Sequence, residues 1–169
     1  MNLVSRKSLT HAFAIHYADS IFISDFANRY SEDGVLDLGS GAGFPGVVLA
    51  VRFPQKKVLL FEKSLKKQGF LSVVVAQLGL RNAEILGSFP KKKNYGFMVA
   101  RAVFPPEELF EFVSQRMLSG SRVVLNFGSM PKPFRVPPSF QLLETAKYSL
   151  PMNQGERQLN LFEFVPRGT

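Results

Sequence analysis

The residues best suited to chemistry lie in one short stretch, 35–46. An apolar run reaches Asp37, glycines alternate over 39–43, and Pro45 precedes a second apolar run. This order predicts a strand, a tight turn and a helix, because proline is tolerated at the first helical position. Glycines at the turn permit positive φ and let a ligand lie against the backbone. At the carboxyl end of the first strand of an open α/β sheet, the expected ligand is nucleotide-like.

Two nucleotide chemistries fit this loop. Gly41, Gly43 and Gly46 have the spacing of the dinucleotide fingerprint. Glu62 follows at the distance expected of a ribose-binding acid. The acid Asp37 followed by alternate glycines is instead typical of S-adenosylmethionine (SAM) sites. A carboxylate at the strand end repels a pyrophosphate but attracts the cationic amine and sulfonium of SAM, so it favours SAM. A glycine turn without a ligand is the third alternative.

The stretch 37–46 resembles the signature of the glucose-inhibited division protein B family, small-subunit ribosomal RNA methyltransferases that act on guanine N7. Further matches follow in family order along nearly the whole chain. They are Asn2-Leu3, 16–20, Lys66-Lys67, Phe70-Leu71, Leu78 with Leu80 and Asn82, Arg101-Ala102, and 155–157. The resemblance implies a Rossmann-like SAM-dependent methyltransferase fold, SAM as the cofactor, and ribosomal RNA or the small ribosomal subunit as the partner.

The composition agrees with a polyanionic partner. The 169 residues carry a formal net charge of +8, which favours RNA, DNA or an acidic membrane surface as the partner. The alternative is a solvated basic protein with no such partner. The chain has no cysteine, which excludes disulfides, thiolate metal sites and cysteine nucleophiles. We expect a cytoplasmic monomer with no membrane span and no metal site. One domain should cover 1–169, with a helical lead-in over 1–30 that is shorter than in the family.

The expected elements alternate between strand and helix. Strands are predicted over 35–38, 57–61, 83–86, 96–100, 121–127, 140–150 and 159–165, and helices over 9–29, 45–51, 65–78 and 105–118. They imply an α/β fold with a mostly parallel seven-stranded sheet, helices on both faces and an antiparallel C-terminal hairpin. Ser64 is expected to cap the third helix. The buried face of that helix is predicted to comprise Phe70, Leu71, Val74 and Leu78.

The predicted cofactor site gathers at the carboxyl ends of the first four strands. Glu62 ends the second strand and is placed to accept ribose hydroxyls, the alternative being a surface carboxylate paired with Lys63. Adenine should lie against the turn after the third strand, where Phe89 could stack on it. The resulting set of SAM ligands is Asp37, Gly39, Ser40, Gly41, Gly43, Phe44, Glu62, Ser88, Phe89 and Arg101.

Arg101 is the predicted catalytic residue. The fourth strand brings it beside the glycine loop, although a buried structural arginine is the alternative. Methylation of cytosine C5 generally needs a cysteine, and 100–103 does not match the Asn/Asp-Pro-Pro-aromatic loop used on adenine amines. Guanine N7 loses no proton on methylation, so a site with an arginine and no evident base fits that target.

Four residues are predicted to contact RNA: His16, Lys66, Lys67 and Arg157. His16 and Asp19 are three apart and share a helix face, so the residues alone favour a satisfied pair on the helix surface, whereas the resemblance favours a substrate role. The two lysines lie in a first helical turn, where the helix dipole disfavours cations and RNA phosphate could offset the cost. Solvated lysines without a partner are the alternative. Arg157 belongs to a stretch that matches the family.

Three departures from the family pattern support a second hypothesis. The family carries Arg-x-Glu at Phe89-Pro90, often an acid at Gly96, and a lysine at Phe127. These differences suggest an RNA-binding protein that keeps the fold with weakened catalysis. An NAD-dependent oxidoreductase is the third hypothesis.

Overall fold

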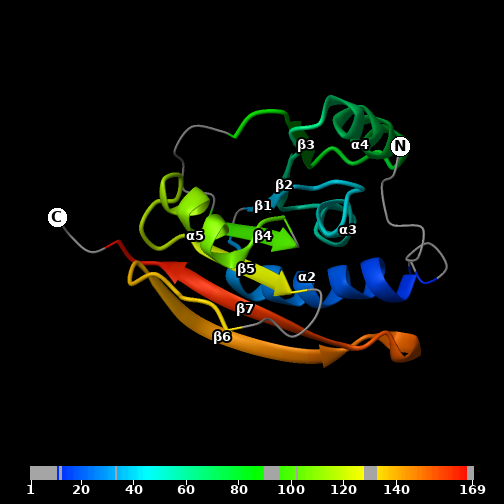
Figure 1. Cartoon of the computed structure of the whole chain (residues 1–169). Helices are drawn as coiled ribbons and strands as arrows, with labels where there is room; N and C mark the ends of the chain where they lie inside the picture. The colour runs from blue at the N-terminus through cyan, green and yellow to red at the C-terminus, as the bar shows by residue number, and fades with distance from the viewer. Residues whose placement is uncertain are drawn as a thin grey trace.

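The computed structural model describes residues 11, 13–32, 34–89, 96–101, 103–127 and 133–166. Its seven strands form one sheet in the order β3-β2-β1-β4-β5-β7-β6 (Figure 1). The strands are β1 (Gly34–Leu38), β2 (Lys57–Phe61), β3 (Ala83–Leu86), β4 (Phe97–Arg101), β5 (Arg122–Phe127), β6 (Phe140–Ser149) and β7 (Glu156–Phe164). The helical segments are η1 (Phe13–Tyr17, a π turn), α2 (Ala18–Tyr30), α3 (Gly46–Arg52), α4 (Leu65–Gln77), α5 (Pro106–Ser114) and the short η2 (Pro151–Asn153).

The sheet confirms the predicted fold class. Strands β1 to β5 pair in parallel, whereas β7 pairs antiparallel with both β5 and β6. Strand β7 therefore lies between β5 and β6, and the last two strands form the predicted antiparallel hairpin. The parallel part obeys the usual rule that a strand, a crossover and the next parallel strand lie in one sheet.

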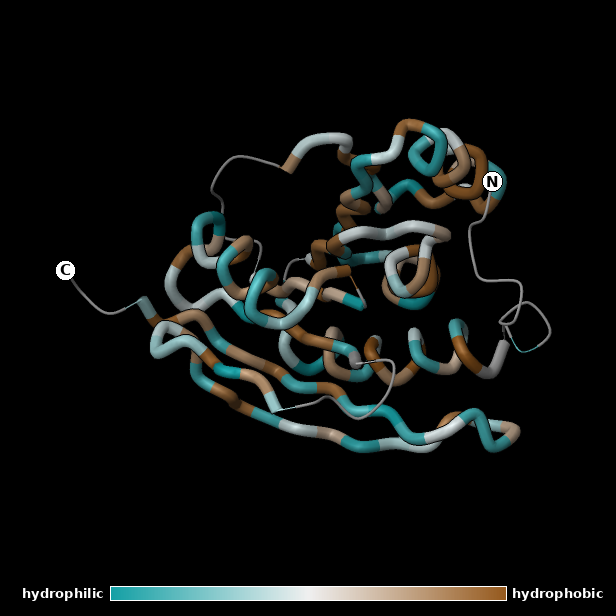
Figure 2. The backbone as a smooth tube through the Cα atoms, in the orientation of Figure 1, coloured by the Kyte–Doolittle hydropathy of each residue, from teal (hydrophilic) through white to brown (hydrophobic). Residues whose placement is uncertain are grey.

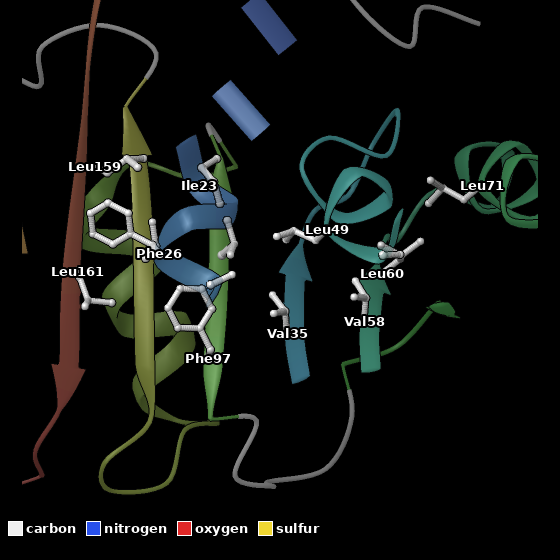
Figure 3. Close-up of a cluster of buried hydrophobic side chains, with 14 residues drawn as sticks. Ile23, Phe26, Val35, Leu49, Val58, Leu60, Leu71, Phe97, Leu159 and Leu161 are labelled. Carbon is white, nitrogen blue, oxygen red and sulfur yellow. The ribbon is translucent and has the colours of Figure 1, made fainter. Parts of the chain in front are cut away.

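Alternating side chains divide the core into two layers. Val35, Val58 and Phe97 point to one face, where they pack with residues of α2 and α3 such as Phe26 and Leu49 (Figure 3). The next residues along the strands point to the other face and pack against Leu109, Phe110 and Val113 of α5. Helices thus cover both faces, as the period-2 pattern of buried strands requires.

Helix α4 departs from its predicted packing. Among its residues only Leu71 is buried, Phe70 and Val74 are partly exposed, and Leu78, just after the helix, is 54% exposed. The reason is position, because α4 lies beside the edge strand β3 at the margin of the molecule (Figure 2). Ser64 occupies the predicted N-cap position, but its side chain makes no capping hydrogen bond.

The ends of the other helices differ modestly from prediction. The first predicted helix is a π turn followed by α2, and α5 ends at Ser114 rather than near residue 118. Pro45 precedes α3 as its N-cap residue instead of opening it. None of the helices in the described residues is long and apolar enough to span a membrane.

Candidate active site

The topology brings six chain segments to one edge of the sheet. The parallel strands β1, β2, β4 and β5 end at this edge, with Arg101 and Asn126 side by side in register. Because β7 runs antiparallel to both β5 and β6, the start of β7 and the end of β6 reach the same edge, where Tyr148 lies opposite Arg157. Ligand sites of open α/β sheets lie at this edge.

Backbone hydrogen bonds hold the glycine loop. The amides of Gly39 and Ser40 both donate to the carbonyl of Phe61, each at 2.9 Å, which ties the loop to the end of β2. Gly41 has φ of +57°, and a Cβ placed there would meet only the Gly39 carbonyl, at 3.7 Å. The loop therefore exposes side-chain-free backbone at the sheet edge, as the glycine pattern predicts.

Asp37 is buried beneath this loop rather than exposed on it. Its Oδ2 accepts a hydrogen bond from the Gly46 amide at 3.0 Å, at the N-terminus of α3. The Ser40 hydroxyl donates to the backbone carbonyl of Asp37 at 3.1 Å. Burial raises the pKa of Asp37 to about 6, against the hydrogen bonds, which lower it. A Cβ on Gly46 would lie 2.5 Å from Oδ2, so this contact requires glycine.

Glu62 is also buried and bound to backbone amides. Its Oε2 accepts from Gly41 at 3.0 Å, and its Oε1 accepts from Ser64 at 2.8 Å. Among the described residues it forms an ion pair with Lys67, whose Nζ lies 3.9 Å from Oε2. The alternative of a surface carboxylate paired with Lys63 is therefore wrong, because the turn after β2 folds Glu62 back onto the glycine loop.

Arg101 lies where the loop meets the N-terminal helix. Its Nη1 lies 3.1 Å from Nδ1 of His16 and 3.7 Å from Oδ2 of Asp19. The His16 ring stacks on Phe44, with centroids 5.6 Å apart, and Cζ of Arg101 lies 5.9 Å from the Phe44 centroid. Burial lowers the pKa of Arg101, whereas the carboxylates of Asp19 and Asp37 raise it.

The contact between the two side chains fixes the state of His16. A guanidinium has only donors, so Nδ1 of His16 must accept and the imidazole must be neutral, with its proton on Nε2. Burial, and then the charge of Arg101, lower the pKa of His16. The histidine thus orients Arg101 without adding a second positive charge.

Asp19 joins Arg101 to the C-terminal hairpin. It is 3% exposed, and its Oδ1 accepts a hydrogen bond from the Tyr148 hydroxyl at 2.7 Å. Nε of Arg157 lies 3.9 Å from the same oxygen. The expected surface pair of His16 and Asp19 is therefore wrong, because this side of the helix faces the sheet edge and not solvent.

The predicted RNA contacts separate into two groups. Lys66 is exposed at the start of α4, next to Lys67, which is half-buried beside Glu62. The side chain of Arg157 is only 12% exposed and lies against Asp19, while His16 lies against Arg101. The structure thus gathers His16, Arg157 and Arg101 in one cluster and places Lys66 outside it.

The turn after β3 brings an aromatic group to the other flank of the site. Ser88 is exposed, and Phe89 packs edge-on against Phe61 and Phe112, with centroids 5.3 Å away in each case. Pro90 and the lysines at 91–93 lie outside the described residues. The predicted ligands therefore occupy the two flanks of one site, with Phe89 beside the end of β2 and Arg101 at the end of β4.

Two polar residues that border this cluster, Tyr148 and Asn126, were not predicted from the sequence. Tyr148 donates to Asp19, and Asn126 Nδ2 donates to the Tyr148 hydroxyl at 3.3 Å. A polar residue at the end of a buried strand was a usable signal for Asn126, by the argument that applied to Arg101. Tyr148 carried no such signal, because its location depends on how the hairpin joins the sheet.

The sequence is similar to that of a known protein family over most of its length. The family model for rRNA small subunit methyltransferase G (GidB) matches residues 1–133. Ribosomal RNA small subunit methyltransferase G of Syntrophomonas wolfei is 39% identical over 127 residues, which are 75% of this chain and 55% of that protein. The protein of the same name from Erythrobacter litoralis is 42% identical over 112 residues, 64% of this chain and 53% of that protein. The matched segments thus span about half the length of these relatives.

Solved structures show the same fold. A mutant of MtNAS in complex with S-adenosylmethionine superposes with a TM-score of 0.71 at 12% identity, covering 97% of this chain and 69% of that one. A SAM-dependent methyltransferase from Aquifex aeolicus gives a TM-score of 0.67 at 16% identity, covering 89% and 92% of the two chains. The fold is that of class I SAM-dependent methyltransferases.

Proposed function

Because this chain belongs to the rRNA small subunit methyltransferase G family, we propose that it transfers a methyl group from SAM to small-subunit ribosomal RNA, at guanine N7. The observation that carries the proposal is the shared edge of the sheet. There an open glycine loop with a buried acid at each side lies next to a partly buried arginine from β4. This arrangement supports the proposal of a cofactor site with a methyl-transfer centre beside it.

The residues of the loop fit SAM. The surface above Gly41 is open, and the adjacent Glu62 carboxylate uses only part of its acceptor capacity on two amides. Glu62 would accept the ribose hydroxyls there. Asp37 would act indirectly, since its carboxylate holds the loop at Gly46 and its negative charge favours a cation nearby. Gly39, Ser40 and Gly43 would shape the backbone surface against which the cofactor lies.

The flanks of the site would receive the rest of the cofactor. Ser88 and Phe89 border the end of β2, where an adenine ring would contact the Phe89 aromatic face or edge. Phe44 lies on the opposite side, against His16, and faces the transfer centre. The bound cofactor supplies an activated methyl group on a positively charged sulfur, and the protein has to position the nucleophile.

Arg101 is the proposed catalytic residue. Its guanidinium would orient the guanine base, and positioning of this kind contributes much of the rate in transfers between two bound reactants. Attack by guanine N7 requires no general base, which agrees with a neutral His16 whose Nδ1 is already committed to Arg101. The net charge of +8 and the exposed Lys66, with Lys67 beside it, would attract the RNA backbone.

Product analysis tests the reaction. Small ribosomal subunits from cells that lack this protein are incubated with it and with SAM carrying a labelled methyl group, and the RNA is digested to nucleosides. We expect the label in N7-methylguanosine. Label in another nucleoside would reject guanine N7 as the target, and tight RNA binding without transfer would support a non-catalytic RNA-binding protein.

A parallel titration tests the cofactor. SAM and NADH are each titrated into the purified protein in a calorimeter. We expect heat of binding from SAM only, because the buried acid at the end of β1 disfavours a pyrophosphate. Binding of NADH without binding of SAM would reject the methyltransferase proposal in favour of an oxidoreductase.

A further inference from the structure

Tyr148 lies on β6, in the C-terminal hairpin, far from Arg101 in the sequence. Its hydroxyl nevertheless donates to Asp19, the carboxylate that lies beside Arg101. We propose that Tyr148 is a positioning residue for methyl transfer, which acts through Asp19 to hold Arg101 in place. The inference rests on the proposed function, since it assigns a new role within that site. The hydroxyl of Tyr148 donates its hydrogen bond to Asp19, so Tyr148 acts through that carboxylate rather than on the reactants.

Distances rank the contacts of Asp19. The Tyr148 hydroxyl lies 2.7 Å from Oδ1, closer than Nε of Arg157 at 3.9 Å or Nη1 of Arg101 at 3.7 Å from Oδ2. A hydrogen bond at 2.7 Å fixes the direction of a carboxylate, whereas an ion pair near 4 Å attracts it without fixing its direction. Tyr148 therefore sets the orientation that Asp19 presents to Arg101.

The Tyr148 hydroxyl is itself fixed from two sides. Its ring stacks on Phe22 of α2, with centroids 4.1 Å apart and an angle of 22° between the planes. Asn126 of β5 donates to the hydroxyl oxygen at 3.3 Å, which leaves the hydroxyl proton for Asp19. The tyrosine thus connects α2, β5 and β6, and its one donor is directed at the buried carboxylate.

Charge explains why this hydrogen bond should affect transfer. Asp19 is nearly inaccessible to water, and burial raises its pKa, whereas the bond from Tyr148 and the charges of Arg101 and Arg157 lower it. Asn126 from β5 also faces Asp19, and its hydrogen bond likewise lowers the pKa of that carboxyl. Without the hydroxyl, the pKa of Asp19 rises further, because the bond favours the charged form. A protonated Asp19 no longer attracts the guanidinium.

The test is Tyr148→Phe, which keeps the ring stack on Phe22 and removes only the hydroxyl. Tyr30→Phe is the matched control, because Tyr30 donates to a carboxylate, Glu144, at 2.5 Å but lies away from the cluster. Transfer rates at saturating SAM are measured as a function of pH for the unsubstituted protein and both variants. The Kd for SAM is measured alongside.

We expect Tyr148→Phe to lower kcat roughly tenfold near neutral pH with an unchanged Kd for SAM, because only the alignment of the base is lost. In the plot of transfer rate against pH, the loss of rate on the acid side should occur at higher pH in Tyr148→Phe than in the unsubstituted protein. The plot for Tyr30→Phe should match that of the unsubstituted protein. A merely structural role would lower activity at all pH values equally. Asp19→Asn is the second variant, and it should show the same low kcat without the loss of rate on the acid side that is due to Asp19.

The outcomes separate the two levels of proposal. If the unsubstituted protein transfers methyl groups and Tyr148→Phe has the same kcat and the same pH profile, the positioning role is wrong and the proposed function stands. If the unsubstituted protein transfers none to unmodified subunits, the proposed function is wrong, and this role falls with it. Should Tyr148→Phe fail to fold, a normal kcat in Asp19→Asn would overturn the inference.

Discussion

The two halves of the site hold their charged groups in different ways. In the loop half, formed by the ends of β1 and β2, both carboxylates accept hydrogen bonds from backbone amides: Asp37 from Gly46, and Glu62 from Gly41 and Ser64. In the arginine half, formed by β4 to β7 and the N-terminal helix, the charged groups meet other side chains. Arg101 contacts His16 and Asp19, and Asp19 accepts from Tyr148.

This difference matches what we propose that each half binds. Backbone donors are fixed by the path of the chain, which suits a cofactor that is the same in every turnover. Side chains can change one at a time, which suits the part of a site that aligns a particular base in a particular RNA. Function of the loop half should therefore be lost when a glycine gains a side chain. Function of the arginine half should be lost when a side-chain functional group is removed.

The largest effect is expected from Gly46→Ala. The new Cβ would lie 2.3 Å from Cδ2 of Leu60 and 2.5 Å from Oδ2 of Asp37, and neither neighbour can move away because both are buried. We expect a loss of about 3 kcal/mol or more in the free energy of unfolding, measured in urea, and no detectable SAM binding. A stable Gly46→Ala protein with normal SAM affinity would show that the Asp37 contact is dispensable.

The next effect concerns pH. Burial raises the pKa of Asp37 to about 6 in the folded protein, above its ordinary value of 3.8. Between these values the folded state binds more protons than the unfolded state, so stability falls as the pH rises through the window. Relative to Asp37→Asn, the unsubstituted protein should lose about 3 kcal/mol from pH 4 to pH 7, at most.

Urea unfolding of both proteins across this pH range measures the effect. The comparison with Asp37→Asn removes the contributions of other acids, including Asp19, which are common to both proteins. A stability difference between the two proteins that stays constant with pH would contradict the raised pKa of Asp37 and therefore its buried, desolvated state.

A smaller effect is expected from Glu62→Gln. The change removes the charge that receives two amide hydrogen bonds, and hydrogen bonds to charged groups contribute about 1.5–3 kcal/mol. SAM affinity should fall about 10- to 100-fold in a calorimetric titration. Glu84→Gln is the control, because Glu84 forms an exposed ion pair with Lys57 on the neighbouring strands. Equal SAM affinities in the two variants would remove Glu62 from the cofactor site.

The smallest effect is expected from Gly69→Ala. Gly69 lies within α4, and a Cβ there meets nothing within 4 Å. Alanine should stabilise the protein by about 0.5–1 kcal/mol through helix propensity, the opposite sign to Gly46→Ala. A destabilised variant, measured by the same urea unfolding, would show that this side of α4 is more closely packed than the structure has it.

The same contrast explains what the sequence could predict. Asp37, the glycine loop and Glu62 lie within 26 consecutive residues, and their order along a strand, turn, helix and strand determines where they meet. Strand alternation and the αβ order likewise predict the sheet. Arg101 could be predicted for two reasons. It matches the family pattern, and it ends a central parallel strand, where the ligands of open α/β sheets bind.

The arginine half could be predicted only in part, because its contacts join residues far apart in the chain. Tyr148 and Asp19 are separated by 129 positions, and their contact depends on β7 pairing with β5 so that β6 lies outside. Nothing in the local pattern of β6 specifies that order. The prediction of the buried face of α4 was wrong for a similar reason. Periodicity shows which face of a helix is apolar but not whether the helix lies at the edge of the sheet.

The most direct test of the account is one rate, that of methyl transfer by Arg101→Lys in a single turnover with saturating SAM and unmodified small subunits. Lysine keeps the positive charge but lacks the planar set of donors that contacts His16. We expect a rate about 100-fold below that of the unsubstituted protein, since misalignment at the transfer centre costs about that much. A rate within about twofold of the unsubstituted protein would contradict the assignment of the transfer step to Arg101 and the division of the site into two halves.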